Sequence, residues 1–568
     1  MIQISHDKLK DWLKEQGLIT DEQFREISDE AGRMNQDVLE LLISKGFVAA
    51  DFLYNFIARY FGVERASLRS RGIDQSVLLL VDEKLAQEKK AVAFAKEQDG
   101  TIDIAMEDPS DLQTIEFLEK KLNAKLRIFL ASSEDLASGF SLYSHAQTED
   151  FKKVLETSIQ KSLRYHADKA EDAAKEVSIV DLVNNLLSYA TYLGASDVHI
   201  EAMEQSVLVR FRIDGILHEI ITIPRQIHAP VVARVKLLGA LKVDEHQKPQ
   251  DGRFRYQVGG SVIDVRISII PTLYGEKIVM RLLSAAQRPL SLAELGFSEN
   301  MADLVEENIK KTYGMVLVTG PTGSGKTTTL YSILNLLNRP EVNIVTIEDP
   351  IEYNIRYINQ IQVNPLAGIT FASGLRSILR QDPNIIMVGE IRDNETADIA
   401  VQSALTGHIV LSSLHTNDAP STVARMLDMD IPPFLAAAVL NVAVAQRLVR
   451  KICIDCIESY ELSEEFKKEL KNQFEELKLP NAELPKSLYR GKGCKACHGI
   501  GYRGRLGIFE IMEINDDMRR TIASPDFTMD HVYEIAKKNG MKTMFEDGLQ
   551  KAAVGVTTIE EVLRVIRE

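Results

Sequence analysis

Four short runs of apolar residues in the second half of the chain predict buried β-strands. They cover residues 315–318, 344–347, 385–388 and 409–411. Runs this short, apolar on both faces, are typical of parallel strands between two layers of helices. After the first run, leucine and isoleucine recur at helical spacing between residues 330 and 337, so a helix is expected there. The pattern predicts an α/β domain with a largely parallel sheet over residues 295–568.

The first half of the chain has a different pattern. Residues 1–140 combine helical periodicity with a hairpin signal at Asp99-Gly100, which predicts an N-terminal α+β domain. Residues 141–175 are charged and lack apolar periodicity, so a partly helical linker is expected. Over 176–285 an amphipathic helix precedes alternating strands, with hairpin signals at Asp214-Gly215 and Gly259-Gly260. This segment is predicted to be an α+β sheet domain.

Length and charge narrow the classes of function. A chain of 568 residues is too long for one core, so several domains are expected. Its net charge of −15 argues against nucleic acid or an anionic membrane as the main partner. The sequence contains no apolar segment of about 20 residues and no N-terminal signal pattern. We expect a cytoplasmic protein that meets a membrane only through partners.

The loop after the first predicted strand matches the phosphate-binding pattern G-x-x-x-x-G-K-[ST]. Its glycines let backbone N–H groups face a phosphate, and the next helix adds the positive end of its dipole. Lys326 is expected to reach the β- and γ-phosphates of ATP, and the Thr327 hydroxyl to bind Mg²⁺. The nucleotide-binding residues predicted here are Gly320, Pro321, Thr322, Gly323, Ser324, Gly325, Lys326, Thr327 and Thr328.

Acidic residues follow two of the predicted strands. Glu348 and Glu352 come after the 344–347 run, and Glu390 comes after the 385–388 run. Ligands of doubly wound sheets lie at the carboxyl ends of the strands, and phosphate hydrolysis requires carboxylates for the water and for Mg²⁺. We expect Glu352 and Glu390 to be catalytic and Glu348 to lie at the nucleotide. Which of the first two orients the water stays open.

Basic residues and histidines supply further candidates. Arg266 and Arg281 alternate with apolar residues on strands of the 176–285 domain and could stabilise γ-phosphoryl charge or form surface ion pairs. His408 and His415 flank the 409–411 run and could sense the γ-phosphate or be structural. Arg376 and Arg380 share one helix face. They could contact another subunit, bind the phosphates or lie in solvent.

The four cysteines form two C-x-x-C pairs, Cys453 with Cys456 and Cys494 with Cys497. In a reducing compartment this spacing favours a tetrahedral Zn²⁺ site over disulfides. Four thiolates leave no open coordination position, so the metal would be structural. The zinc subdomain is expected over 450–508, followed by a helical part over 511–568.

Several of these segments resemble motifs of one family. They are an Asp box at 346–353 (TIEDPIEY), a Walker B segment at 387–393 (MVGEIRD), a His box at 406–417 (TGHIVLSSLHTN), a cysteine knuckle at 493–505 and a C-terminal segment at 545–549 (FEDGL). Together they resemble the type II secretion and type IV pilus assembly ATPase family, with an extension-type, GspE/PilB-like pattern. Retraction motors of this family resemble shorter chains that lack an N-terminal domain and cysteine knuckles. This chain has both features, so an assembly motor is favoured.

The resemblance implies a homo-hexameric ATPase with a RecA-like domain and a PAS-like domain that supplies Arg266 and Arg281. It implies a motor for type IV pili or type II secretion pseudopili, peripheral at the inner face of the cytoplasmic membrane. The partners would be an inner-membrane platform protein and an adaptor that docks on the N-terminal module. Residues 37–42 (DVLELL) lack the arginine and glycine of R-L-G-type cyclic di-GMP motifs, so docking is the expected role of that module.

Two other classes of function remain as alternatives. A DNA translocase would share the phosphate loop, although the acidic charge disfavours it, and a GTPase would need a guanine motif of the [NT]-K-x-D type, which the chain lacks. A non-catalytic scaffold could use the cysteine knuckle and N-terminal domain for binding. The presence of Lys326, Thr327 and Glu390 argues against a scaffold.

Overall fold

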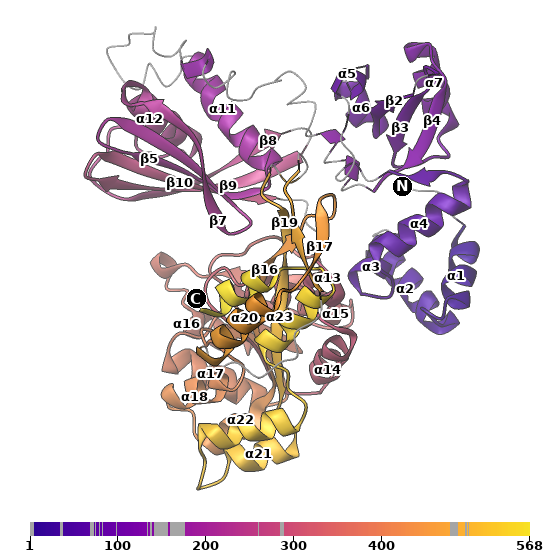
Figure 1. Ribbon diagram of the computed structural model, residues 1–568. Coiled ribbons are helices and arrows are strands. Elements are labelled where there is room, and N and C mark those ends of the chain that lie inside the picture. The colour runs from indigo at the N-terminus through magenta and orange to yellow at the C-terminus, as the bar shows by residue number, and fades with distance from the viewer. Residues whose placement is uncertain are drawn as a thin grey trace. The chain divides into compact units, whose positions relative to one another are not determined.

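The computed structural model divides into two compact units (Figure 1). One contains Met1–Leu9 with Ala50–Gln287, and the other contains Lys10–Ala49 with Arg288–Glu568. The residues not described are 1–4, 35–37, 67, 69–72, 74, 79, 82, 98, 133–134, 137–138, 141–156, 160–176, 259–260, 285–288, 477–486, 495–496, 498 and 568. Among the residues that are described, no helix has the length and hydropathy required to cross a membrane.

The second unit is built on a mostly parallel sheet. Its described strands number seven, in the order β13-β12-β14-β15-β11-β16-β19. The pairs up to β11·β16 are parallel, and β19 is antiparallel to β16. The strands are β11 (Gly314–Thr319), β12 (Ile344–Glu348), β13 (Ile358–Gln362), β14 (Ile385–Val388), β15 (Ile409–Leu414), β16 (Leu440–Ile452) and β19 (Tyr502–Glu513).

Helices cover both faces of this sheet because its strands are apolar on both faces. In β11, Val316 and Val318 pack into the cluster on one face, and Met315 and Leu317 pack into the cluster on the other. The first face carries α13 (Leu292–Leu295), α14 (Glu299–Ile309) and α15 (Lys326–Leu337). The second carries α16 (Phe371–Ile378), α17 (Asn394–Leu405), α18 (Ser421–Asp428), α19 (Pro433–Val439), α21 (Asp516–Ile522), α22 (Met529–Lys538), α23 (Met544–Ala553) and α24 (Ile559–Arg567).

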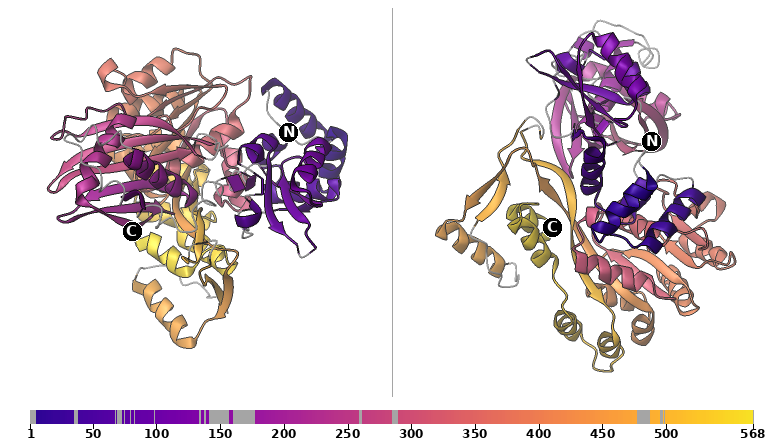
Figure 2. Two further views of the ribbon diagram at one scale, coloured as in Figure 1. Left: turned by 90° about the horizontal axis from the view of Figure 1, so that it is seen from above. Right: turned by 90° about the vertical axis from the view of Figure 1, so that its right-hand side faces the viewer.

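An insertion between β16 and β19 carries the cysteines. It contains β17 (Ile457–Glu461), α20 (Glu464–Glu476) and β18 (Ser487–Gly491), and β17 pairs antiparallel with β18. In the right-hand view of Figure 2 this orange segment extends from the side of the sheet.

In the first unit, an antiparallel sheet carries helices on one face. Its six described strands are ordered β7-β6-β5-β10-β9-β8. Alternate residues such as Val198, Phe211 and Ile278 face α11 and α12 and form the core, and Figure 1 shows these helices over the sheet. The elements are α11 (Val177–Tyr192), β5 (Ala195–Ala202), β6 (Ser206–Ile213), β7 (Ile216–Pro224), α12 (His228–Leu238), β8 (Gln250–Val258), β9 (Ser261–Thr272) and β10 (Gly275–Ser284).

The N-terminal part combines helices with a small sheet. The described strands follow the order β1-β4-β3-β2. Asp111 caps α7 by accepting from the Thr114 backbone N at 3.1 Å. The elements are α1 (His6–Glu15), α2 (Asp21–Met34), α3 (Val38–Ser44), α4 (Ala50–Phe61), β1 (Glu64–Arg65), α5 (Gln75–Leu78), α6 (Glu83–Lys89), β2 (Ala91–Lys96), β3 (Ile102–Met106), α7 (Leu112–Leu122) and β4 (Leu126–Leu130).

The predicted fold class is confirmed. The four apolar runs are β11, β12, β14 and β15, and the hairpins at Asp99-Gly100 and Asp214-Gly215 join β2 to β3 and β6 to β7. Gly259-Gly260 and the linker segment 141–175, apart from residues 157–159, lie outside the described residues. So does residue 37 of the segment 37–42, whose other residues lie in α3.

Candidate nucleotide-binding site

The phosphate loop joins β11 to α15 at the carboxyl edge of the parallel sheet. Gly320 (φ 144°), Gly323 (φ 82°) and Gly325 (φ 90°) adopt backbone conformations that other residues avoid. At Gly320, a Cβ atom would lie 2.5 Å from the Gln446 carbonyl oxygen and 2.7 Å from Ser324 Oγ. Glycine is therefore required where the loop packs against β16.

Lys326 opens α15 and folds back onto the loop. Its Nζ donates to the carbonyl oxygens of Gly320 at 2.8 Å and Pro321 at 3.1 Å. Burial lowers the pKa of this ammonium, and the nearby Glu390 partly opposes that shift. Gly325 occupies the N-cap position and has no side chain to cap the helix, so the first N–H groups of α15 have no side-chain cap. Thr327 is exposed in the first turn. The helix N-terminus thus presents a cation, hydroxyls and N–H groups to an anion.

Gln446 of β16 holds this loop and was not among the residues predicted from the sequence. Its buried amide donates from Nε2 to the Ser324 carbonyl at 2.7 Å and accepts from Thr329 Oγ1 at 2.7 Å. One side chain thereby ties β16 to both the loop and α15. The available signal was a glutamine within an apolar strand, where a buried amide needs partners.

Glu390 follows β14 and lies among cationic groups at the same edge. Its Oε1 accepts from Arg392 Nη2 at 2.5 Å, and its Oε2 is 3.4 Å from His415 Nε2. Serine hydroxyls of β15 fix the backbone before it, Ser412 Oγ to the Val388 carbonyl at 2.7 Å and Ser413 Oγ to the Gly389 carbonyl at 2.8 Å. The structure therefore brings Lys326, Glu390 and His415 to one edge of the sheet.

Glu348 lies at the centre of a buried hydrogen-bond network. Its Oε1 accepts from Thr346 Oγ1 at 2.6 Å and from Gln360 Nε2 at 3.0 Å, and its Oε2 accepts from the Tyr331 hydroxyl. That hydroxyl also accepts from the Glu352 backbone N at 3.2 Å. Burial and the Glu348 charge strongly raise the pKa of Tyr331, so it stays a donor. The network connects the helix of the phosphate loop to the segment that carries Glu352.

One candidate residue, His408, lies at the opposite edge of the sheet. His408 precedes β15, and its carbonyl accepts from the Gly314 N at 3.1 Å at the start of β11. Because a strand rises about 3.3 Å per residue, His408 lies about 20 Å from the phosphate loop along the sheet. Its Nδ1 is 2.9 Å from the Ser403 carbonyl oxygen. Arg376 pairs with Glu395 at 2.5 Å, and Arg380 donates to the Arg376 carbonyl at 2.9 Å.

The two candidate arginines of the first unit lie in one cross-strand row. Arg266 of β9 is directly opposite Arg281 of β10 on one side and Arg253 of β8 on the other. The row lies on the face opposite α11 and α12, because Val265 and Ile267 point into the helical core. Like charges directly opposite each other on neighbouring strands are destabilising. Asp197 compensates Arg281 at 3.0 Å, and the Arg281 side chain remains 60% exposed.

The four cysteine sulfurs form one cluster. All Sγ atoms lie within 4.8 Å of one another, with Cys453–Cys494 and Cys456–Cys497 separations of 3.8 Å. A tetrahedral Zn²⁺ with bonds of about 2.3 Å places sulfurs about 3.8 Å apart. Burial opposes ionisation of Cys497, but backbone N–H groups of Cys494 and Gly501 outweigh it and lower the pKa of the thiol to about 7. The donor set fits a structural metal.

A buried carboxylate supports the segment after His415. Glu510 of β19 is 4% exposed, and its Oε1 accepts from the Ala419 backbone N at 2.9 Å. Burial raises the pKa of Glu510 to about 7. Its charge state therefore changes near neutral pH.

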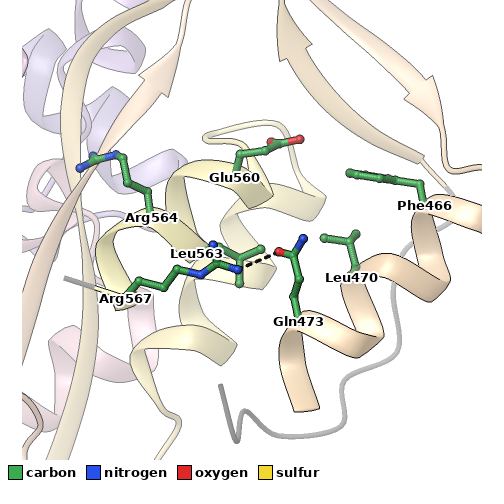
Figure 3. A pocket seen from close by; sticks show the side chains of 7 residues that line it. All are labelled: Phe466, Leu470, Gln473, Glu560, Leu563, Arg564 and Arg567. Atoms are coloured by element: carbon green, nitrogen blue, oxygen red, sulfur yellow. Dashed lines mark hydrogen bonds between the residues drawn. The ribbon is translucent and has the colours of Figure 1, made fainter. Parts of the chain in front are cut away.

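A surface cavity of about 390 Å³ lies away from the phosphate loop, between α20 and α24 (Figure 3). Arg567 Nη2 donates to Gln473 Oε1 at 3.1 Å across it. None of the predicted site residues lines this cavity. The lining residues are Phe466, Leu470, Gln473, Glu560, Leu563, Arg564 and Arg567.

A glycine-rich loop between a parallel strand and a helix, with a lysine and a strand-end glutamate beside it, defines a P-loop nucleotide-binding protein. Residues 172–564 match the family model described as Type II/IV secretion system protein, and residues 61–150 match the MshEN domain. The chain therefore belongs to the type II/IV secretion system protein family and is an ATPase, which confirms the resemblance drawn from the sequence.

Individual relatives agree with this assignment. The Type IV pilus assembly ATPase PilB of Myxococcus xanthus is 37% identical over 568 residues and covers 98% of each chain. The Type II secretion system ATPase E of Vibrio cholerae is 42% identical over 456 residues, 80% of this chain and 88% of that protein. The X-ray structure of the Yersinia pseudotuberculosis ATPase DotB shares the fold, with a TM-score of 0.52 and 20% sequence identity. The match covers 68% of this chain and 93% of the DotB chain.

The hydrogen-bond network around Glu348 predicts that Tyr331→Phe destabilises the folded protein. The variant removes one donor to the Glu348 carboxylate and the acceptor of the Glu352 N–H, so we expect unfolding to require about 1–2 kcal/mol less. Hydrogen exchange at the Glu352 amide should become faster. Tyr353→Phe is the matched control, because Tyr353 joins the network through its carbonyl, which accepts from Gln360 Nε2 at 3.2 Å. Equal exchange at Glu352 in the parent and Tyr331→Phe would contradict the network.

The raised pKa of Glu510 predicts that the stability of the folded state depends on pH. Burial raises its pKa from 4.5 to about 7, so the folded state binds more protons than the unfolded state between these values. Stability should fall as pH rises through that window, by about 3 kcal/mol at most. Glu510→Gln carries no charge, so its thermal midpoint relative to the parent should be higher at pH 8 than at pH 5. The same offset at both pH values would refute the prediction.

Proposed function

We propose that the protein is the ATP-driven extension motor of a type IV pilus or of a type II secretion pseudopilus. The observation that carries this proposal is similarity to a pilus assembly ATPase over 98% of both chains, including the N-terminal part, combined with the gathered phosphate-loop residues. That coverage favours the pilus. The shorter match to the secretion ATPase E of Vibrio cholerae supports the secretion system as the second candidate.

The proposed catalytic roles use the groups at the carboxyl edge of the sheet. Lys326 and the N–H groups at the start of α15 bind the phosphates. Thr327, together with Glu352 or Glu390, would hold Mg²⁺, and the ion would supply positive charge to the phosphates. Glu352 is held by Tyr331 through its backbone, and Glu390 is held by Arg392 and by β15. These two carboxylates share the tasks of orienting water and completing the metal shell.

Arg266 and Arg281 supply positive charge for the γ-phosphate. Their cross-strand row presents two guanidinium groups on the face away from the core, and planar guanidinium groups bind phosphate oxygens in pairs. When hydrolysis removes the γ-phosphate, these contacts are lost. That loss is the event coupled to movement.

The motor works as a homo-hexamer at the inner face of the cytoplasmic membrane. The N-terminal domain, residues 1–140, docks on an adaptor, and the ring transmits its movement to an inner-membrane platform protein. The sheet domain, 176–285, carries the arginines, and residues 295–568 carry the ATPase. This arrangement accounts for an acidic chain whose described helices do not reach the length of a membrane span.

The ATPase test uses Lys326→Ala. Without the ammonium at the phosphates, kcat should fall by about 100-fold or more. Lys310→Ala is the control, because Lys310 lies on the surface and pairs with Glu306 at 3.1 Å. Electron microscopy should show the same six-membered ring for both variants with a non-hydrolysable ATP analogue. Full turnover by Lys326→Ala would refute the proposed site, and monomers throughout would refute the ring.

We also infer that the cysteine cluster holds one structural Zn²⁺. The sulfur–sulfur separations of 3.7–3.8 Å match a tetrahedral site, and four thiolates complete the coordination shell. Metal analysis of the purified protein should find one zinc ion per chain. Cys494→Ser should lose it, whereas Lys326→Ala should retain it. A metal-free parent protein that is fully folded would exclude the site.

A further inference from the structure

A carboxylate continues the arginine row of the six-stranded sheet. Arg281 of β10 lies directly opposite Asp197 of β5, which in turn lies opposite Arg212 of β6. Asp197 is therefore flanked by an arginine on each side and lies on the same face of the sheet as Arg266.

Asp197 holds Arg281 at a single nitrogen. Asp197 is 5% exposed, and its Oδ1 accepts from Arg281 Nε at 3.0 Å. Its Oδ2 accepts from Ser196 Oγ at 2.8 Å and lies 3.7 Å from Arg212 Nε. The Arg281 side chain is 60% exposed. A buried, hydrogen-bonded carboxylate therefore anchors the inner edge of an exposed guanidinium group.

The use of Nε determines what Arg281 can offer a ligand. Guanidinium has five N–H donors in a fixed planar fork, so a bond at Nε sets the direction of the two terminal NH₂ groups. Those terminal groups form the edge that binds two phosphate oxygens together. A flexible arginine would have to lose its side-chain freedom when the phosphate binds, and Asp197 reduces that loss.

We propose that Asp197 is a positioning residue that directs Arg281 at the γ-phosphate of ATP. The inference rests on the proposed function, since it takes Arg281 as an arginine that contacts the triphosphate. It assigns Asp197 no contact with the nucleotide. Loss of Asp197 should therefore act only through Arg281.

The sheet contains a matched control for the loss of a buried carboxylate. Glu201 lies four residues further along β5, on the same face, and is 6% exposed. It pairs with Arg210 at 2.8 Å and with Lys277 at 2.8 Å. Neither of these cations belongs to the row of Arg266 and Arg281. Removing its charge disturbs the same strand without disturbing Arg281.

The experiment compares ATP hydrolysis by the full-length protein with Asp197→Asn, Arg281→Ala, the double variant and Glu201→Gln. Thermal unfolding is measured on each. We expect Arg281→Ala to lower kcat by about 10- to 100-fold and Asp197→Asn by about tenfold, with KM for ATP changed less than about twofold in Asp197→Asn. The double variant should be no slower than Arg281→Ala, because residues acting in one unit are not additive. Glu201→Gln should keep kcat within about twofold of the parent while losing similar thermal stability.

The outcomes separate the two proposals. Unchanged kcat in Arg281→Ala would refute the role of Arg281 in the proposed function, and the inference with it. A slow Arg281→Ala with a fully active Asp197→Asn would leave the proposed function intact and overturn the positioning role. Multiplying losses in the double variant, or an equal loss of kcat in Glu201→Gln, would also overturn it.

Discussion

The packing of the phosphate loop against β16 is the constraint on which the nucleotide site depends. The loop approaches the strand so closely at Gly320 that no side chain fits, and Gln446 then ties β16 to Ser324 and Thr329. Both ends of one buried amide are used, so the loop and the first turn of α15 are held relative to the sheet. A phosphate site built from backbone N–H groups requires this fixed backbone, because displacement of the loop would misdirect all of its donors together.

The acidic residues of the site differ in how they are held. Glu348 is 2% exposed and binds protein donors, whereas the Glu390 side chain is 15% exposed and has cations beside it. A fully buried carboxylate with three donors is suited to fixing neighbouring segments. A partly exposed one beside Lys326 and His415 can exchange partners when a ligand and metal arrive. Sequence position alone does not distinguish these roles, because both residues follow parallel strands of the same sheet.

The sequence predicted the parallel sheet and the phosphate loop because both depend on local patterns. Apolar runs give the strands, and the spacing of glycines and lysine gives the loop. Gln446 was missed because its partners are more than a hundred residues away in the chain, and a lone glutamine in a strand does not reveal them. The position of His408 was available from the sequence. It precedes the 409–411 run, so in a parallel sheet it lies at the amino ends of the strands, opposite the phosphate loop, and the register of β11 and β15 agrees.

The length of β16 has a consequence for how the cysteine insertion relates to nucleotide binding. The strand runs from Leu440 to Ile452 without interruption, so the glutamine that holds the loop and Cys453 belong to one continuous segment. Seven residues of extended chain, about 23 Å, separate Gln446 from Cys453. Between Gln446 and Arg450 the strand is paired with β19 only, because its pairing with β11 ends at Ala445, and the register with β19 shifts between Arg450 and Ile452. The projecting insertion and the amide that shapes the phosphate cradle are therefore joined by a single strand, so a displacement of the insertion would reach the loop along β16.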